Sequence, residues 1–203
     1  MSLGRVVAVM ADVHGEYLAL HRALELCRAE RVETLALLGD LFDRPDQADR
    51  CALLLAEWPV IGVYGNHERE IAIAAARRQL ELQPETVRLL SSLRERLVIG
   101  DVCFTHEILG QNWADDGALC WDLRSPSRDG RPHVTFAGHT HYRQAWEDRG
   151  PLDISRGWLA LDPRRRYLIN PGALAAGQFA IWHRSQGIIV FRDVDGSKGQ
   201  SRG

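Results

Sequence analysis

The sequence lacks a charge imbalance, because its 203 residues include 25 Lys and Arg residues and 27 Asp and Glu residues. This balance gives no overall field that would recruit nucleic acid or an anionic membrane. A basic groove interleaved with aromatic side chains is also missing, so a nucleic-acid partner is not expected. An anionic substrate must therefore be attracted by charges at one local site.

Long apolar runs and paired cysteines are missing as well. No apolar run approaches the roughly 18 residues of a membrane span, and the start lacks the charged-then-apolar profile of a signal peptide. The four cysteines form no Cys-x-x-Cys pair, and each lies in an apolar stretch that suits a small buried side chain. These features predict a cytoplasmic protein with no membrane contact.

The length and the lack of internal repeats favour one domain. A chain of this size can bury a single sizeable core without disulfides or structural metals. We expect a single domain over residues 1–195 and a flexible, small and polar tail at 196–203. The oligomeric state stays open, because one chain gives no sign of symmetry.

The first half of the chain alternates strands and helices. Apolar, β-branched runs predict buried strands at 5–11, 34–38 and 60–64. Apolar residues at helical spacing predict helices at 16–30, 46–57, 69–82 and 84–96. From residue 97 onward short strands dominate, and a turn at 185–187 joins the last two as a hairpin. This order predicts an α/β domain in which helices cover central sheets.

Polar clusters follow many of these strands directly, at the carboxyl ends where α/β sheets place their ligand sites. The clusters are Asp12-Val-His14-Gly15, Gly39-Asp40, Gly65-Asn66-His67, His106 and Gly138-His139-Thr140-His141. They supply carboxylate oxygen, amide oxygen and imidazole nitrogen but no thiolate, a donor set that suits Mn, Fe, Zn or Ni. The glycines beside these residues predict sharp turns and a close approach of backbone to the site.

The spacing within two clusters suggests how their side chains converge. Asp12 and His14 are two residues apart, as are His139 and His141. On an extended segment, residues two apart point the same way, so each pair is expected to face one centre. Taken singly, Asp40 and Asp43 would instead be read as helix N-caps. The conjunction of all the clusters favours the metal site.

These motifs, D-V-H-G, G-D-L-F-D-R, G-N-H-E, His106 and G-H-T-H, in this order, resemble those of the calcineurin-like metallophosphoesterase superfamily. The resemblance implies an α/β fold, a four-layer α-β-β-α sandwich of two mixed β-sheets, with a dinuclear site at one end. It implies two divalent transition-metal ions, with Mn as the first choice and Fe, Zn or Ni as alternatives. It implies a first set, Asp12, His14, Asp40 and His141, and a second set, Asp40, Asn66, His106 and His139, bridged by Asp40.

Two such ions would attract phosphate locally and would lower the pKa of a bound water from about 15.7 to near 7. The predicted reaction is thus hydrolysis of a phosphoester by a metal-bound hydroxide nucleophile. By the same resemblance His67 donates a proton to the leaving group, Asp43 pairs with His67, and Asn66 and Arg44 contact the substrate. Arg44 would hold a phosphoryl oxygen with its planar guanidinium.

Several functions remain open within this resemblance. The leading one is a phosphodiesterase or phosphatase for a small phosphoester or nucleotide. The GDxxDR and GNHE motifs also resemble those of diadenosine tetraphosphatases and protein phosphatases, which suggests nucleotide polyphosphates or phosphoproteins as alternatives. A non-catalytic interaction scaffold is the third hypothesis, and the presence of His67 argues against it.

Two departures leave the subfamily open, because Glu107 and Pro45 stand where many members have glycine. The loop at 107–132 carries no motif that names a substrate. Its Trp113 is interpreted as a buried or loop-anchoring residue rather than a platform for a nucleobase. The motif Asn170-Pro171-Gly172 resembles a turn that supports the site in the smaller bacterial members.

Overall fold

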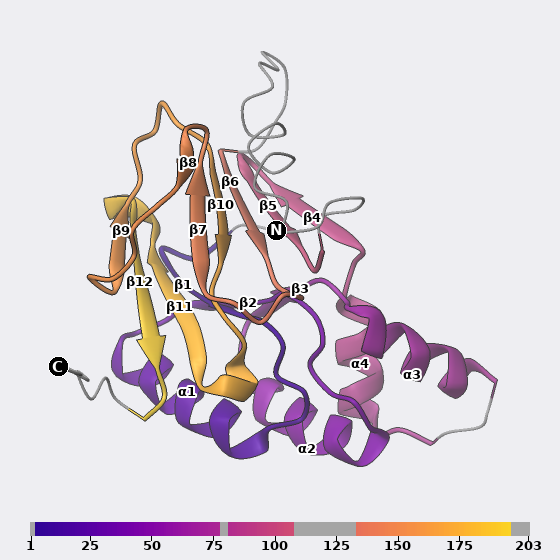
Figure 1. The fold of residues 1–203 in the computed structure, drawn as a ribbon. Helices are drawn as coiled ribbons and strands as arrows, with labels where there is room; N and C mark the ends of the chain where they lie inside the picture. Colours follow the sequence, from indigo (N-terminus) through magenta and orange to yellow (C-terminus); the bar gives the residue numbers. More distant parts are fainter. Residues whose placement is uncertain (1–2, 78–80, 108–132, 196–203) are drawn as a thin grey trace, which may run out of the picture.

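The computed structural model describes residues 3–77, 81–107 and 133–195, which form two β-sheets and a set of helices (Figure 1). The predictions for Trp113, for most of the 107–132 loop and for the 196–203 tail lie outside these residues. No helix of the described part is both long and apolar enough to cross a membrane.

The first sheet has six strands in the order β3-β2-β1-β11-β12-β9. These strands are β1 (Val6–Met10), β2 (Thr34–Leu37), β3 (Val60–Gly62), β9 (Trp158–Ala160), β11 (Gln178–His183) and β12 (Ile188–Asp193). Strands β1, β2 and β3 are parallel, since helical segments return the chain between them. Strands β11 and β12 form the predicted hairpin, and β11 pairs with β1 in antiparallel register.

The second sheet also has six strands, in the order β4-β5-β6-β10-β7-β8. These strands are β4 (Arg96–Ile99), β5 (Val102–Thr105), β6 (Val134–Ala137), β7 (Gln144–Glu147), β8 (Gly150–Pro151) and β10 (Tyr167–Asn170). Strands β5, β6 and β10 are parallel, β4 and β7 pair with them in antiparallel register, and β8 is antiparallel to β7. Both sheets are therefore mixed, and the predicted α/β architecture of two mixed sheets is confirmed.

Two apolar clusters define the layers. Four helices contribute to the cluster on the outer face of the first sheet: α1 (Tyr17–Ala29), α2 (Pro45–Leu55), α3 (Asn66–Ala76) and α4 (Pro84–Ser92). The other cluster fills the space between the sheets. Strand β1 faces both, because Ala8 and Met10 point to the helices whereas Val7 and Val9 point to the second sheet. The helical layer expected outside the second sheet stays a prediction, since the described helices all belong to the first layer.

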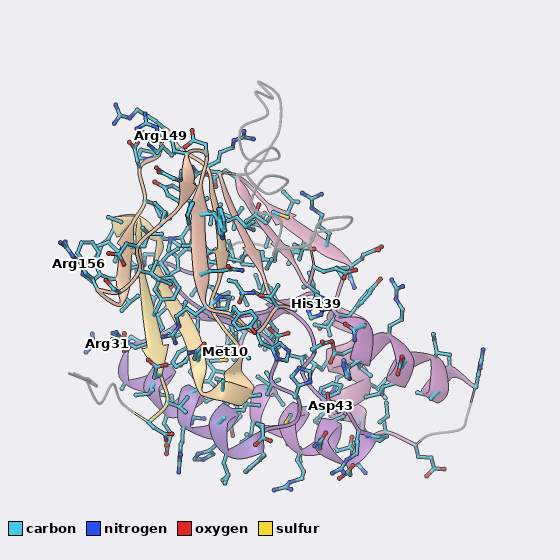
Figure 2. All side chains as sticks on the ribbon, viewed as in Figure 1. Met10, Arg31, Asp43, His139, Arg149 and Arg156 are labelled. Atoms are coloured by element: carbon cyan, nitrogen blue, oxygen red, sulfur yellow. The ribbon has the colours of Figure 1, made fainter. Side chains whose placement is uncertain are left out.

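The register aligns the ends of the parallel strands. Met10 pairs with Leu37, and Leu37 pairs with Gly62, so β1, β2 and β3 end at one edge. Thr105 and Ala137 align the ends of β5 and β6 in the second sheet. The segments that follow these strands carry the predicted site residues. In Figure 2, Asp43 and His139 lie where strand ends meet helices, whereas Arg31, Arg149 and Arg156 lie at the periphery.

Candidate functional site

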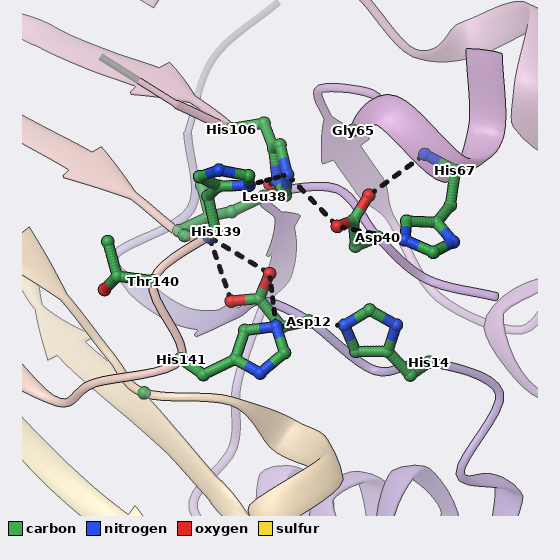
Figure 3. A network of polar contacts seen from close by, with 12 residues as sticks. Asp12, His14, Leu38, Asp40, Gly65, His67, His106, His139, Thr140 and His141 are labelled. Atoms are coloured by element: carbon green, nitrogen blue, oxygen red, sulfur yellow. Dashed lines mark hydrogen bonds and ion pairs between the residues drawn. The ribbon is translucent and has the colours of Figure 1, made fainter. Parts of the chain in front are cut away.

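Imidazole rings and carboxylates from segments far apart in the chain converge beyond these strand ends. Figure 3 shows five histidines, His14, His67, His106, His139 and His141, around the carboxylates of Asp12 and Asp40. Both carboxylates are buried, with exposed fractions of 0% for Asp12 and 3% for Asp40. Buried acidic side chains require a compensating positive group, and here that group must come from the histidines or a bound cation.

The first group joins the segment after β1 to the segment after β6. One donor atom from each of Asp12, His14 and His141 lies within 4.8 Å of the others. The Nε2 atoms of His14 and His141 are 3.0 Å apart, and His141 Nε2 is 3.8 Å from Asp12 Oδ1. Three of the four residues predicted for the first metal are therefore neighbours.

The second group joins the ends of β2, β5 and β6. Donor atoms of Asp40, His106 and His139 also lie within 4.8 Å of one another. His106 Nε2 is 3.2 Å from Asp40 Oδ2, 3.2 Å from His139 Nδ1 and 3.3 Å from Asn66 Oδ1. The other three residues predicted for the second metal thus surround one nitrogen atom of His106. That Asp40 also serves the first group stays a prediction.

Asp43 occupies a position between two histidines. Its Oδ1 atom is 3.1 Å from His67 Nδ1, in agreement with the expected neighbourhood, and 2.6 Å from His14 Nδ1. The contact with His14 was not predicted. A carboxylate only accepts, so Nδ1 of His14 carries the proton and Nε2 presents its lone pair toward His141. One side chain therefore orients both a candidate ligand and the candidate proton donor.

A second interaction of this kind orients His106. Its Nδ1 atom donates to the carbonyl of Leu38 at 2.7 Å, which turns Nε2 toward Asp40 and Asn66. Without a metal, Nε2–H donates to Asp40, and a bound cation would take the place of that proton. Ring nitrogens of His14 and His106 thus face the same region as the buried carboxylate oxygens, and this donor set fits divalent metal ions.

The backbone at the site is left-handed, which the sequence analysis did not anticipate. Six non-glycine residues of the described segments have positive φ, and five are candidate ligands with φ between 48° and 70°: Asp12, His14, Asp40, His139 and His141. Each such residue costs about 1–3 kcal/mol, so the surroundings must hold it in place. The expectation of extended Asp-x-His and His-x-His segments was wrong. Asp12 and His14 join one donor group because the backbone turns at both residues, whereas the same turns direct His139 and His141 into different donor groups.

Glycines leave room for this turn. A Cβ atom at Gly65 would lie 2.1 Å from Asp40 Oδ1, and one at Gly39 would lie 2.5 Å from the Gly65 nitrogen. Gly138 is similarly close-packed, with a Cβ position 3.1 Å from Asp12 Oδ2. The predicted close approach of backbone is therefore present, and any larger residue would push these segments apart.

Hydrogen bonds fix the His139 segment. The backbone N–H of His139 donates to both carboxylate oxygens of Asp12, at 3.0 and 3.1 Å. Asn170 is fully buried, and its Nδ2 donates to the Gly138 carbonyl at 2.9 Å and to Thr140 Oγ1 at 3.0 Å. The Asn-Pro-Gly turn at the end of β10 thus supports the segment that carries His139 and His141, as its motif suggested.

The two carboxylates have opposite pKa shifts. Burial raises the pKa of Asp12 to about 6, against the opposing charge of His106 and the N–H of His139. Burial also acts to raise the pKa of Asp40, but the hydrogen bond and charge of His106 hold it below its ordinary value. Burial, reinforced by the charge of His14, lowers the pKa of His141. The neutral ring of His141 and the ionised Asp40 are the forms that bind metals.

The remaining predicted site residues lie at the starts of two helices. Asn66 and His67 belong to the first turn of α3, which begins three residues earlier than predicted. Arg44 is exposed at the start of α2, and its guanidinium contacts Asp46 at 3.3 Å. The role of Arg44 toward substrate therefore stays a prediction.

Sequence reasoning missed one buried acid, Glu68. It is 1% exposed, and its carboxylate accepts backbone N–H groups from both the Asp40 and Gly65 segments. Glu68 is the last residue of the G-N-H-E motif, which could have marked it as part of the site. The motif alone does not indicate what its side chain binds.

Comparisons with known proteins agree with this geometry. The model of the calcineurin-like phosphoesterase superfamily domain matches residues 6–191. An uncharacterised protein of Methanocaldococcus jannaschii is 25% identical over 195 residues, covering 83% of this chain and 76% of the relative.

Two solved structures share the fold. A metallophosphoesterase from Sphaerobacter thermophilus has a TM-score of 0.72 at 23% identity, with 95% of this chain and 89% of that chain covered. An archaeal phosphodiesterase has a TM-score of 0.57 at 20% identity, with 93% and 99% covered. The family match extends from β1 into β12 and includes all the clustered motifs. The chain therefore belongs to the calcineurin-like phosphoesterase superfamily and is a hydrolase that acts on phosphoester bonds.

Proposed function

We propose that this hydrolase uses two divalent metal ions to cleave a small phosphodiester or phosphomonoester. The observation that carries the proposal is the pair of adjacent donor groups, Asp12–His14–His141 and Asp40–His106–His139. Asn66 Oδ1 adds an uncharged oxygen to the second group. Asp40 is proposed to belong to both, since a carboxylate has two oxygens. Mn²⁺ is the first ion to test, followed by Fe, Zn and Ni.

The bound ions would supply Lewis acidity toward the phosphoryl group and toward an attacking water. The side chains of the chain have separate tasks. His67 has its Nδ1 atom beside Asp43, so Nδ1 carries a proton and the ring is oriented by the carboxylate. The other nitrogen, Nε2, lies on the side of Asp40, at 3.9 Å from its Oδ2. We propose that Nε2–H donates to the leaving-group oxygen.

A diester is the first substrate class to test, because the archaeal structural neighbour is named a phosphodiesterase. Nucleotide polyphosphates and phosphoproteins are the alternatives that the GDxxDR and GNHE motifs support. The interaction scaffold is disfavoured by His67 beside Asp43, since a scaffold has no need of an oriented proton donor.

The test is an assay of purified protein, stripped with chelator and reloaded with Mn²⁺, on bis-p-nitrophenyl phosphate and p-nitrophenyl phosphate. We expect turnover that follows metal loading and saturates near two ions per chain. A parallel series with Fe, Zn and Ni covers the other ions. If no ion restores turnover of any phosphoester, and metal analysis finds the protein empty, the hydrolytic proposal fails and the scaffold hypothesis gains support.

Arg44→Ala is expected to reduce monoester and dinucleotide turnover more than diester turnover. A monoester carries an extra phosphoryl charge that the planar guanidinium can hold. A hydrogen bond to a charged group contributes about 1.5–3 kcal/mol, or about 10- to 150-fold in rate. Arg44 must leave Asp46 to make this contact, so Asp46→Ala should not reduce turnover.

The matched control is Arg156→Ala, which removes an exposed arginine at the periphery of the molecule. The measurement is kcat/KM on paired monoester and diester substrates with the same leaving group. An equal loss on both substrate classes would contradict the assignment of Arg44.

A further inference from the structure

Glu68 is a buried carboxylate beside the site that the proposed chemistry does not use. We propose that Glu68 is a positioning residue, which binds the segment carrying Asp40 and the segment carrying Asn66 and His67 into one unit. The effect on metal binding and turnover rests on the proposed function, whereas the effect on the two segments does not.

Four backbone N–H groups donate to this side chain. Its Oε2 atom accepts from Asp40 and from Gly65, both at 2.8 Å. Its Oε1 atom accepts from Leu41 at 2.6 Å and from Phe42 at 3.3 Å. Each carboxylate oxygen of Glu68 therefore accepts two hydrogen bonds.

A helix-capping role explains only one of these bonds. Glu68 is the third residue of α3, and the bond to Gly65 is the return contact of a capping box. The other three bonds reach residues 26 to 28 positions earlier in the chain, in the segment that follows β2. A glutamate that only caps a helix is also normally exposed, whereas Glu68 is 1% exposed.

The two segments held by Glu68 are in direct contact and are strained. A Cβ atom at Gly65 would lie 2.6 Å from the Asp40 nitrogen, so no side chain separates them. Asp40 has φ of 50°, an unfavourable conformation that its N–H bond to Glu68 helps to hold. Asp40 Oδ1 in turn accepts from the N–H of His67 at 3.2 Å. Glu68 thus sets the distance between a candidate bridging ligand and the candidate proton donor.

Glu68→Gln keeps the size of the side chain but replaces one oxygen by an NH₂ group. Whichever oxygen is replaced, two backbone donors then face a donor, and either Leu41 with Phe42 or Asp40 with Gly65 loses its acceptor. The fold is expected to survive, because the substitution keeps the size of the side chain and removes no apolar group from the two apolar clusters. Glu70→Gln is the matched control, since Glu70 is an exposed residue of the same helix and loses the same charge.

The expected result is a split between stability and function. Glu68→Gln should bind Mn²⁺ about 10- to 100-fold more weakly, as is typical when an outer partner of a ligand is lost. At saturating Mn²⁺ its kcat should still fall, while KM changes little and the metal-free protein keeps a cooperative unfolding transition. Glu68→Asp, which retains the carboxylate, should recover part of both losses, and Glu70→Gln should match the wild type. Wild-type Mn²⁺ affinity and kcat in Glu68→Gln would overturn the proposal.

Hydrogen exchange on the wild-type protein tests the same inference without a variant that could misfold. The amides of Asp40, Leu41 and Gly65 should exchange slowly and in concert, because one carboxylate accepts all three. If they exchange as fast as unprotected loop amides, the proposal fails. This result also separates the two proposals. If these amides are protected but no metal ion activates the protein, the proposed function is wrong. The proposal that Glu68 positions the two segments would still stand.

Discussion

Asp40→Asn should abolish binding of at least one metal ion and reduce phosphoester turnover by at least about a hundredfold. Loss of an outer partner of a metal ligand already costs about 10- to 100-fold in affinity. Asp40 is proposed as a direct ligand, and its Oδ2 atom lies 3.2 Å from His106 Nε2 within the second donor group. Against the effect of burial, the hydrogen bond and the charge of Asp40 raise the pKa of His106, and removal of this carboxylate takes both away.

Stability of the metal-free protein should also fall, because the lowered pKa of Asp40 shows that the folded protein favours its ionised form, a contribution lost only at acidic pH. Asp12 and Asp40 are both buried, and the charge of Asp40 contributes to the raised pKa of Asp12. The asparagine removes this repulsion but also the stronger attraction between Asp40 and His106, so metal-free Asp40→Asn should unfold at a lower temperature than the wild type at neutral pH. Added Mn²⁺ should raise the unfolding temperature of the wild type, because a ligand that binds the folded state stabilises that state. The same addition should raise the unfolding temperature of the variant much less.

Metal analysis, Mn²⁺ titration and thermal unfolding measure these effects. Asp101→Asn is the control, because Asp101 is exposed and loses the same charge away from the donor groups. If Asp40→Asn retained two ions per chain at wild-type affinity, the assignment of Asp40 as a shared ligand would be wrong.

The features of this protein that follow from short-range sequence patterns were predictable. The apolar run at 6–10 is buried on both faces as a parallel strand should be, and the polar clusters lie at the strand ends. The order of the motifs also predicted that Asp12, His106 and His141 lie in one site, although more than a hundred residues separate Asp12 from His141. Such long-range assembly came from the family resemblance, since local patterns carry no information on which strand ends meet.

The details that sequence reasoning missed depend on the folded backbone. Left-handed conformations at Asp12 and Asp40 are unfavourable for non-glycine residues, so propensity predicts against them. They persist because bonds from elsewhere hold them, such as the bond from the Asp12 nitrogen to the Gly39 carbonyl at 3.1 Å. The contacts of Asp43 with both His14 and His67 likewise depend on the folded structure, which brings these three segments together. Local sequence names the residues, but only the packed structure gives their partners.

His67→Ala should reduce kcat by about 10²- to 10⁴-fold while both metal ions stay bound. His67 lies outside the two proposed metal-binding groups, although its ring forms a third group of possible ligand atoms with His14 and Asp43. Its contacts are instead with Asp43, at 3.1 Å from Nδ1, and with Asp40, at 3.9 Å from Nε2. Removal of the ring therefore takes away a proton donor without taking away a proposed ligand, and KM should change less than kcat.

The leaving group distinguishes a proton donor from a residue that only shapes the site. A weakly basic leaving group such as p-nitrophenolate departs without protonation, whereas an alkoxide needs a proton in the transition state. The loss in His67→Ala should therefore be small for p-nitrophenyl esters and should grow along a series of phenyl and alkyl esters. His21→Ala provides the control, because His21 lies on α1 and contacts Glu25 rather than the site. A loss that is the same for every leaving group would show that His67 is not the general acid, and full turnover in His67→Ala would remove it from the mechanism altogether.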